Sequence, residues 1–194
     1  MENGLELAYP AKKRGKEKMK KIMVVGVSAG VGKSTFAREL GEKLDLPVYH
    51  LDSYHWKPGW IEADKNEFRK AIEKLVNEDA WIIEGNYSST IDLRLAEADT
   101  LIYLELPLRV CLYRVLKRWL TNLGRTRPDM GEGCPERMEW EFLKFIITTY
   151  SRRKTEMKQR LKKFQGMDVR NQPVMLASRE QIHGFLEGLQ KDSH

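Results

Sequence analysis

The stretch Gly30-Val31-Gly32-Lys33-Ser34-Thr35 decides the fold of this chain. It follows an apolar run at residues 22–25 and precedes a segment in which Phe36, Leu40 and Leu44 recur at helical spacing. A strand, a glycine-rich turn and a helix in this order bring backbone N–H groups and a helix N-terminus to one point, where they bind phosphates. We expect all six residues of the stretch to contact ATP.

Three side chains of this stretch have distinct expected roles. Lys33 is expected to reach the β- and γ-phosphates and the Ser34 hydroxyl to ligate Mg²⁺, while Thr35 can contact the α-phosphate. The usual spacing GxxxxGK[ST] is not met, because residue 27 is valine and the preceding glycine, Gly26, comes one residue too early. We therefore expect the loop to be one residue longer at its start, which leaves the role of Gly26 open.

Further apolar runs alternate with helical patterns along the rest of the chain. They lie at residues 48–51, 81–83, 101–104 and 174–176. Most of the runs are fully apolar rather than alternating, which is typical of strands in a parallel sheet that helices cover on both faces. Asp64 with Glu67, and Ser178 with Gln181, are typical helix starts. The sequence therefore predicts an α/β fold.

The chain between residues 123 and 137 interrupts this pattern. A helix predicted from Pro107 to about Asn122 gives way to glycines, prolines and arginines, and a second helical pattern begins near Trp140. An insert of this composition is a candidate lid, which would exclude water from the transferring phosphate and so suppress hydrolysis.

Arginines near this insert are candidate catalytic residues. In phosphoryl transfer, negative charge spreads over the γ-phosphate oxygens, and guanidinium groups neutralise it. Arg118 and Arg125, nearest the base of the lid, are expected to do so. Arg114 lies one helical turn before Arg118 and is equally consistent with an ordinary solvent-facing residue.

Carboxylates follow three of the apolar runs, at Asp52, Glu84 and Glu105. In an open parallel sheet, ligands bind beyond the carboxyl ends of the strands. Glu84 is therefore expected to hold Mg²⁺ through water, and Asp52 to accept a proton from the phosphoryl acceptor or to position it. The alternative is that each merely caps the following turn. Glu105 has no partner that indicates a function.

Trp56 and Trp60 lie in an aromatic segment shortly after Asp52. They are consistent with an acceptor pocket, in which they would stack on a flat substrate, and equally with a cover over the edge of the sheet. His50 and His55 have no companions at the spacing of metal ligands, so a histidine metal site is not expected.

The charge of the chain is concentrated at its start. The whole chain of 194 residues has a formal net charge of +6, and residues 1–21 alone hold seven Lys and Arg against three Glu. We expect residues 1–21 to be a disordered basic extension, the alternative being a DNA-binding arm. The near-neutral remainder, residues 22–194, is expected to form one domain and not to bind DNA directly.

Composition also constrains the compartment. Cys111 and Cys134 form neither a CxxC pair nor a Cys/His cluster, which favours a reducing compartment without structural zinc. No stretch has the length and apolarity of a membrane span, and we expect a cytoplasmic protein.

The chain resembles one family over about residues 22–190, the DNA topology modulation (FlaR-like) proteins, which are P-loop kinase-like proteins similar to adenylate kinase. The resemblance rests on GVGKST at 30–35, HLD at 50–52 with WKPGW at 56–60, WIIEGNYSSTIDLRL at 81–95, ADTLIYLELP at 98–107 and GRTRPDMGEGCPER at 124–137. It implies an adenylate-kinase-like three-layer fold, a P-loop NTPase with five parallel strands in the order 2-3-1-4-5, an ATP site on the loop and an arginine-bearing lid at about 123–137.

The same resemblance implies a role for Arg94. Glu84-Gly85 looks like the Asp-Gly pair of nucleotide kinases, and an arginine shortly after that pair contacts the acceptor phosphate. The family name suggests an effect on DNA supercoiling, but no DNA-reading element is visible, and neither a fold nor a name establishes a substrate.

Two functions remain in competition at this point. The first is an ATP- and Mg²⁺-dependent phosphotransferase that moves the γ-phosphate to a small molecule or a nucleotide. The second is an ATP-binding regulator that affects DNA topology without kinase activity, which would need a basic stripe outside the extension. A guanine-nucleotide switch is not favoured, because no NKxD-like segment follows the fourth predicted strand.

Overall fold

The computed structural model describes residues 19–168 and 171–189. The predicted basic extension at residues 1–21 falls mostly outside the described residues. Its last residues are described, and the first strand begins at Lys21, one residue earlier than expected. The backbone N–H groups of Lys20 and Lys21 both donate to the Asp99 carboxylate, at 2.9 and 2.8 Å, which fixes the entry into this strand.

A parallel sheet of five strands forms the centre of the domain, in the order β2-β5-β1-β6-β7. This confirms the predicted α/β class and, because β3 and β4 lie outside the sheet, the predicted order 2-3-1-4-5. The central strands are apolar because they are covered on both faces, and the side chains of Ile22, Ile82 and Ile102 are fully buried. The five strands are β1 (Lys21–Gly26), β2 (Val48–His50), β5 (Trp81–Glu84), β6 (Thr100–Leu104) and β7 (Gln172–Leu176).

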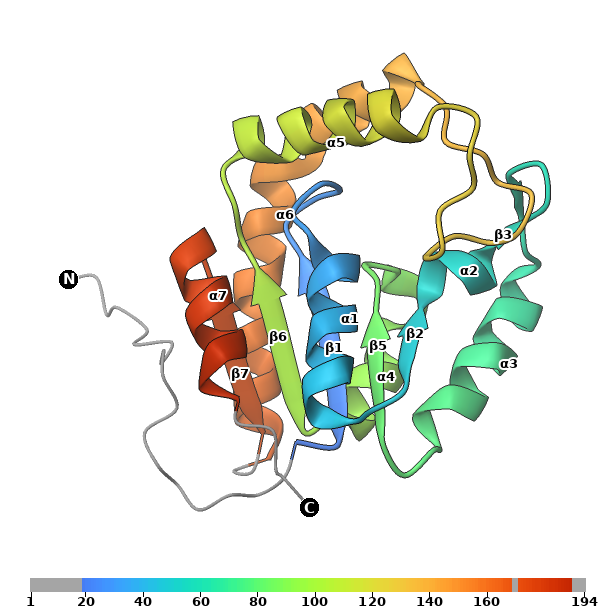
Figure 1. Ribbon diagram of the computed structural model, residues 1–194. Coiled ribbons are helices and arrows are strands. Elements are labelled where there is room, and N and C mark those ends of the chain that lie inside the picture. The colour runs from blue at the N-terminus through green and yellow to red at the C-terminus, as the bar shows by residue number, and fades with distance from the viewer. Residues whose placement is uncertain (1–18, 169–170, 190–194) are drawn as a thin grey trace.

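Helices cover both faces of the sheet and make the three layers (Figure 1). On one face lie α1 (Lys33–Leu44) and α7 (Arg179–Gly188). On the other face lie α4 (Ile91–Glu97) and α6 (Trp140–Met167), with α3 (Lys65–Val76) packed beside α4. The predicted caps are present, since Asp64 accepts from the Glu67 N–H and Ser178 from the Gln181 N–H. None of the helices in the described part of the chain is long and apolar enough to span a membrane.

One helix crosses the top of the sheet. After β6, α5 (Leu108–Asn122) arches over the carboxyl ends of the strands, and residues 123–139 lead from it to the start of α6 (Figure 1). Within this segment, two isolated bridges pair Leu123 with Glu136 and Thr126 with Pro135. We call residues 123–139 the lid segment.

The second strand is shorter than the sequence suggests. It ends at His50, and the next residues form the short helix α2 (Leu51–His55). The Ser53 hydroxyl donates to the His50 carbonyl at 2.7 Å and so favours this turn over an extended backbone. A small antiparallel hairpin follows, made of β3 (Trp56–Lys57) and β4 (Ile61–Glu62), which the sequence patterns did not predict.

Candidate active site

A cavity of about 990 Å³ lies at the carboxyl edge of the sheet. Its walls come from the loop before α1, the ends of β2 and β5, α5, the lid segment and the β3–β4 hairpin. The predicted residues of the loop, 30–35, line it together with Asp52, Glu84 and Arg118. Trp56 and Trp60 also line it. Segments far apart in sequence therefore converge on one site.

The loop between β1 and α1 is built for an anion. Gly30 and Gly32 have φ angles of 77° and 104°, a left-handed backbone that side chains with a Cβ rarely adopt. A Cβ on Gly30 would also clash with the backbone oxygen of Cys111 in α5. The first backbone hydrogen bond of α1 runs from Phe36 N to Gly32 O at 3.0 Å, so the N–H groups of residues 33–35 at the start of the helix have no intrahelical partner. The free N–H groups and the helix N-terminus fit a polyphosphate.

The structure explains the unusual spacing of this loop. Val27 is buried and its N–H donates to Leu104 O at 2.9 Å, so the sheet pairing continues to this residue. Gly26 exchanges two hydrogen bonds with the Asn86 side chain, at 3.0 and 2.7 Å. A Cβ on Gly26 would lie 2.9 Å from the Lys33 side chain. Gly26 is therefore the residue that gives the lysine room to cross the loop.

Glu84 is the hub of the polar contacts at the end of β5. Its carboxylate accepts from the Ser34 hydroxyl at 3.1 Å, lies 3.0 Å from His50 Nδ1 and forms an ion pair of 3.5 Å with Lys33 Nζ. Burial alone would raise the pKa of Glu84, but Lys33, His50 and Ser34 outweigh it and hold the pKa below its usual value. Glu84 is therefore ionised at neutral pH.

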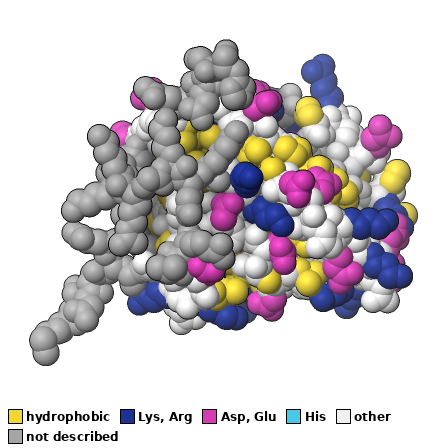
Figure 2. All heavy atoms as spheres, turned by 90° about the horizontal axis from the view of Figure 1, so that it is seen from below, with side chains coloured by type: hydrophobic (Ala, Val, Ile, Leu, Met, Phe, Trp, Pro, Cys, Tyr) yellow, Lys and Arg dark blue, Asp and Glu magenta, His cyan; other side chains and the backbone are white. Residues whose placement is uncertain are grey.

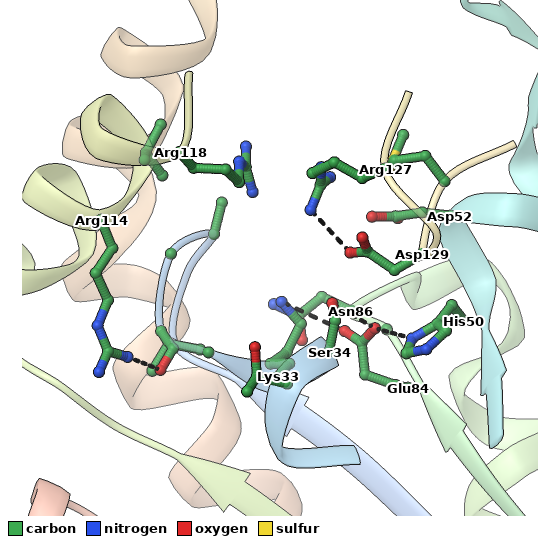
Figure 3. A pocket seen from close by; sticks show the side chains of 18 of the residues that line it. Lys33, Ser34, His50, Asp52, Glu84, Asn86, Arg114, Arg118, Arg127 and Asp129 are labelled. Atoms are coloured by element: carbon green, nitrogen blue, oxygen red, sulfur yellow. Dashed lines mark hydrogen bonds and ion pairs between the residues drawn. The ribbon is translucent and has the colours of Figure 1, made fainter. Parts of the chain in front are cut away.

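These residues fit a magnesium ion held partly by nucleotide. No group of three or more His, Cys, Asp and Glu among the described residues could hold a metal by itself. Mg²⁺ in phosphoryl-transfer sites instead keeps several waters and takes one or two protein oxygens together with phosphate oxygens. The Ser34 hydroxyl at the start of α1 and the adjacent Glu84 carboxylate can supply such oxygens (Figure 3).

Asp52 and Tyr87 face the cavity as a hydrogen-bonded pair. The Tyr87 hydroxyl donates to Asp52 Oδ1 at 2.7 Å, and packing against His55 and Phe68 holds the phenol ring. Burial raises the pKa of Asp52, and the nearby charge of Glu84 raises it further. A carboxylate with a raised pKa is a better proton acceptor, which suits the role expected of Asp52.

Two arginines point toward each other across the cavity (Figure 3). One is Arg118 from α5, and the other is Arg127 from the lid segment. The buried carboxylate of Glu136 joins them, with Oε1 3.0 Å from Arg118 Nε and Oε2 2.8 Å from Arg127 Nε. Asp129 pairs with Arg127 Nη1 at 2.8 Å. Both guanidinium groups are thus paired with carboxylates, Arg118 and Arg127 Nη1 through hydrogen bonds and Arg127 Nε through an ion pair that is not aligned as a hydrogen bond.

The structure corrects the expectation for Arg125. Its side chain is exposed and does not line the cavity. The backbone of Arg125 is hydrogen-bonded within the lid segment, because its carbonyl accepts from Glu136 N at 2.9 Å. The chain turns toward the cavity only at residues 127–130, where Met130 N donates to Arg127 O at 3.1 Å. Arg127 therefore takes the place that the sequence interpretation gave to Arg125.

Arg114 supports the loop from behind. Its Nη1 donates to the Val31 carbonyl at 2.9 Å, and a Cβ on Gly32 would lie 3.0 Å from the same nitrogen. The sequence left open a charge-neutralising arginine and an ordinary solvent-facing residue; the contact to Val31 instead favours a positioning role at the phosphate loop.

Arg94 is also corrected. Its side chain is fully buried and donates to the carbonyls of Gly85 at 2.9 Å, Tyr87 at 2.6 Å and Thr90 at 3.4 Å. It does not line the cavity, and burial lowers its pKa to about 9. Arg94 therefore shapes the turn that carries Asn86 and Tyr87 rather than contacting a substrate.

The two tryptophans lie at the cavity, but the lid segment already holds one of them. Trp56 and Trp60 both line the cavity and meet edge to face, with ring centroids 5.5 Å apart. The Trp60 indole N–H donates to Pro135 O at 3.0 Å, and the Arg137 guanidinium lies 5.2 Å from its ring centroid. Trp60 is therefore engaged by the lid segment and is not a free stacking surface.

Several residues of the site were missed by sequence reasoning. Asn86 and Tyr87 follow Glu84 directly, and their polar side chains after a strand were a usable signal. His50 was dismissed for lack of metal-ligand companions, whereas its actual partner is Glu84. Glu136 and Arg127 gave no distinct signal, because nothing in the lid sequence indicates which charged residues face inward.

Comparisons with known proteins agree on the fold. No family model and no curated protein matches the chain. Among solved structures, shikimate kinase from Acinetobacter baumannii, in complex with shikimate, has a TM-score of 0.54 at 14% identity, covering 89% of this chain and 91% of its own. Shikimate kinase from Bacteroides thetaiotaomicron has a TM-score of 0.52 at 17% identity, covering 89% of this chain and 96% of its own.

At such identities the likeness shows the fold alone, and the resemblance to DNA topology modulation proteins stays a prediction. The order of the parallel strands, the glycine-rich loop at the end of β1 and the likeness to these kinases together show that the chain has the P-loop kinase-like fold.

Proposed function

We propose that the protein is an ATP-dependent phosphotransferase that moves the γ-phosphate of ATP to a hydroxyl group of a small molecule or nucleotide. One observation carries the proposal. The phosphate loop, the Asp52–Tyr87 pair and the Arg118–Glu136–Arg127 cluster face the same cavity from three sides, which is the set of groups that in-line phosphoryl transfer requires.

The phosphate end of this site lies at the start of α1. The N–H groups of residues 29–35 would bind the phosphates, and Lys33 would exchange its ion pair with Glu84 for the β- and γ-phosphate oxygens. Ser34 and Glu84 would hold Mg²⁺, directly and through water respectively. Bound there, Mg²⁺ neutralises charge on the β- and γ-phosphates.

The acceptor end lies beside Asp52. As the acceptor oxygen forms its bond to the γ-phosphorus, the bond from that phosphorus to the β–γ bridging oxygen breaks and ADP leaves. The hydroxyl proton passes to the Asp52 carboxylate, whose raised pKa favours this transfer. Tyr87 keeps the carboxylate oriented through its hydrogen bond to Oδ1.

The third part of the site is the pair of arginines that would contact the γ-phosphate during transfer. Arg118 and Arg127 would neutralise charge on the γ-phosphate oxygens, and Glu136 sets the spacing of their forks. The lid segment would also exclude water, so that the acceptor rather than water is phosphorylated.

One further feature supports the proposal, and the cysteines bear on the compartment. The Acinetobacter baumannii neighbour is a kinase that was solved with its small-molecule acceptor, and it shares this fold. Cys111 and Cys134 are free and buried, which favours a reducing compartment such as the cytoplasm.

The alternative, a DNA-directed regulator, finds no support on the surface seen in Figure 2. On the described part of this face, Lys and Arg side chains are interspersed with Asp and Glu and form no continuous basic stripe. Direct binding to a phosphate backbone would need such a stripe and a steep dependence on salt.

The experiment that tests the proposal has two parts. MgATP binding is measured by calorimetry on the wild type and on Lys33→Ala, and ADP release is then followed across nucleosides, nucleoside monophosphates and small alcohols. Release that one acceptor class stimulates, and that Lys33→Ala lacks, supports the phosphotransferase. Tight MgATP binding with no stimulated release by any acceptor favours the ATP-binding regulator instead.

A further inference from the structure

The β3–β4 hairpin contacts the second half of the lid segment. Figure 1 shows the hairpin beside the chain that leaves α5. A Cβ on Gly131 would clash with the Trp56 carbonyl, so the close approach depends on glycine. The hydrogen bonds that join the two segments run from Gly59 N to Gly133 O at 2.9 Å, from Trp60 Nε1 to Pro135 O at 3.0 Å and from Cys134 Sγ to Lys57 O at 3.2 Å.

Trp60 has an unusual backbone for its residue type. Its φ angle is 64°, and Asp45 is the only other described residue apart from glycines with a positive φ. A left-handed backbone is unfavourable for a residue with a Cβ, and such outliers persist only where surrounding contacts hold them. Here the lid segment supplies those contacts, and the side chain is held on both its N–H edge and its face.

Trp60 contacts the two residues that precede and follow Glu136 in the sequence. Its indole N–H binds the carbonyl of Pro135, and its ring carries the guanidinium of Arg137 at 5.2 Å. Between these two residues lies Glu136, whose carboxylate pairs with Arg118 at 3.0 Å and with Arg127 at 2.8 Å. Trp60 therefore contacts both neighbours of the carboxylate that pairs with the two cavity arginines, Pro135 through its backbone carbonyl and Arg137 through its side chain.

We infer that Trp60 is a positioning residue for phosphoryl transfer, acting through Glu136 on Arg118 and Arg127. The inference rests on the proposed function and extends it, because it assigns control of the arginines to the hairpin on the acceptor side of the cavity. The hairpin and the lid segment move as one body. An acceptor that binds against the hairpin therefore also orients the guanidinium groups of Arg118 and Arg127.

The kinetic test uses Trp60→Phe, which keeps a ring beside Arg137 and removes the N–H to Pro135. The matched control is Trp140→Phe on α6, whose side chain is 79% exposed and does not line the cavity. We expect kcat to fall about 10- to 100-fold in Trp60→Phe, as for a small misplacement of catalytic groups, while the Kd for MgATP stays within about twofold. Trp140→Phe should match the wild type. A parallel loss of kcat and MgATP affinity would overturn the inference, because it would indicate general damage.

A double-mutant cycle tests the route through Glu136. If Trp60 acts through this carboxylate, adding Trp60→Phe to a Glu136→Gln protein should lower kcat by less than about twofold further. Full additivity of the two losses would contradict the route.

A third measurement does not depend on turnover, so it separates this inference from the proposed function. Hydrogen exchange is followed at the Gly59, Gly124 and Glu136 amides, each of which donates a hydrogen bond within the hairpin–lid body. We expect exchange at least about tenfold faster in Trp60→Phe and unchanged in Trp140→Phe. Unchanged exchange at all three amides would overturn the inference even in an active enzyme. Should Trp60→Phe fail to fold, Arg137→Gln, which removes the contact to the ring together with the ion pair to Glu139, should accelerate the same amides more than Glu139→Gln, which removes the ion pair alone.

Discussion

The Lys33 ammonium lies 3.5 Å from Glu84 Oε1, so the lysine of the phosphate loop is paired with the carboxylate at the end of β5. Both side chains are largely buried, and their attraction is a main reason why the pKa of Glu84 is low. The ion pair holds the Lys33 ammonium at the phosphate loop. Phosphate oxygens would replace the Glu84 carboxylate as its partner there.

Removal of this lysine should weaken nucleotide binding. In Lys33→Ala, the affinity for MgATP should fall at least about 10- to 100-fold, because charge-assisted contacts to the phosphates are lost. Calorimetric titration measures the affinity, and circular dichroism checks that the fold is intact. Lys20→Ala is the matched control, since the Lys20 side chain is exposed. An unchanged MgATP affinity in Lys33→Ala would remove this lysine from the site.

Substitution of Asp52 should separate binding from transfer. Asp52→Asn keeps the size of the side chain but cannot accept the hydroxyl proton, so kcat should fall about 10²- to 10⁴-fold while MgATP affinity is retained. Steady-state kinetics with the best acceptor measures the fall. Equal turnover by the two proteins would exclude Asp52 as the proton acceptor.

The pH dependence follows from the sign of the shift at Asp52. Burial raises its pKa above the ordinary 3.8, so the carboxylate becomes protonated at a higher pH than in a free chain. The acceptor proton requires the ionised form, and kcat/KM should therefore fall as the pH drops through the raised pKa. This acid limb should lie above pH 3.8 in the wild type and be absent from Asp52→Asn. A limb that persists in the variant belongs to another group.

Arg127 and Arg125 form a matched pair for a third test. Arg127→Ala removes a guanidinium that faces the cavity and should lower kcat about 10³-fold or more, as expected for a transition-state arginine. Arg125→Ala removes an exposed side chain and should stay within about twofold of the wild type. Equal losses in the two variants would contradict the arrangement of the lid segment.

Arg94 should matter for stability rather than for substrate affinity. In Arg94→Met, the carbonyls of Gly85 and Tyr87 lose a buried donor, which should lower the free energy of unfolding by about 1–3 kcal/mol. Urea denaturation measures this change, with Arg69→Met on the exposed face of α3 as the control. A variant with wild-type stability and a raised KM for the acceptor would restore the substrate-contact hypothesis.

Much of the fold could be predicted because it depends on local patterns. The apolar runs identify the strands, and Asp64 and Ser178 mark helix starts through hydrogen bonds that span only a few residues. The strand order came from the family resemblance, not from the patterns themselves. The β3–β4 hairpin was missed because each of its strands has two residues, too short for any periodicity.

The candidate site was partly predictable for the same reason. Lys33, Ser34, Glu84 and Asp52 lie at strand ends or in the loop, where chain direction alone brings them to one edge of the sheet. The orientation of Arg118 and the lid arginines depends on tertiary contacts that no local pattern encodes. Glu136 decides which guanidinium groups face inward, and its partners lie 9 and 18 positions away in sequence.

The central claim is that the γ-phosphate goes to an acceptor and not to water. The most direct measurement compares, in one reaction, the amounts of ADP and inorganic phosphate formed from MgATP with the most stimulating acceptor, while phosphorus NMR identifies the new ester. The account predicts ADP in large excess over inorganic phosphate, with an ester signal that Asp52→Asn lacks. Equal amounts of ADP and inorganic phosphate with every acceptor, and no ester signal, would contradict it.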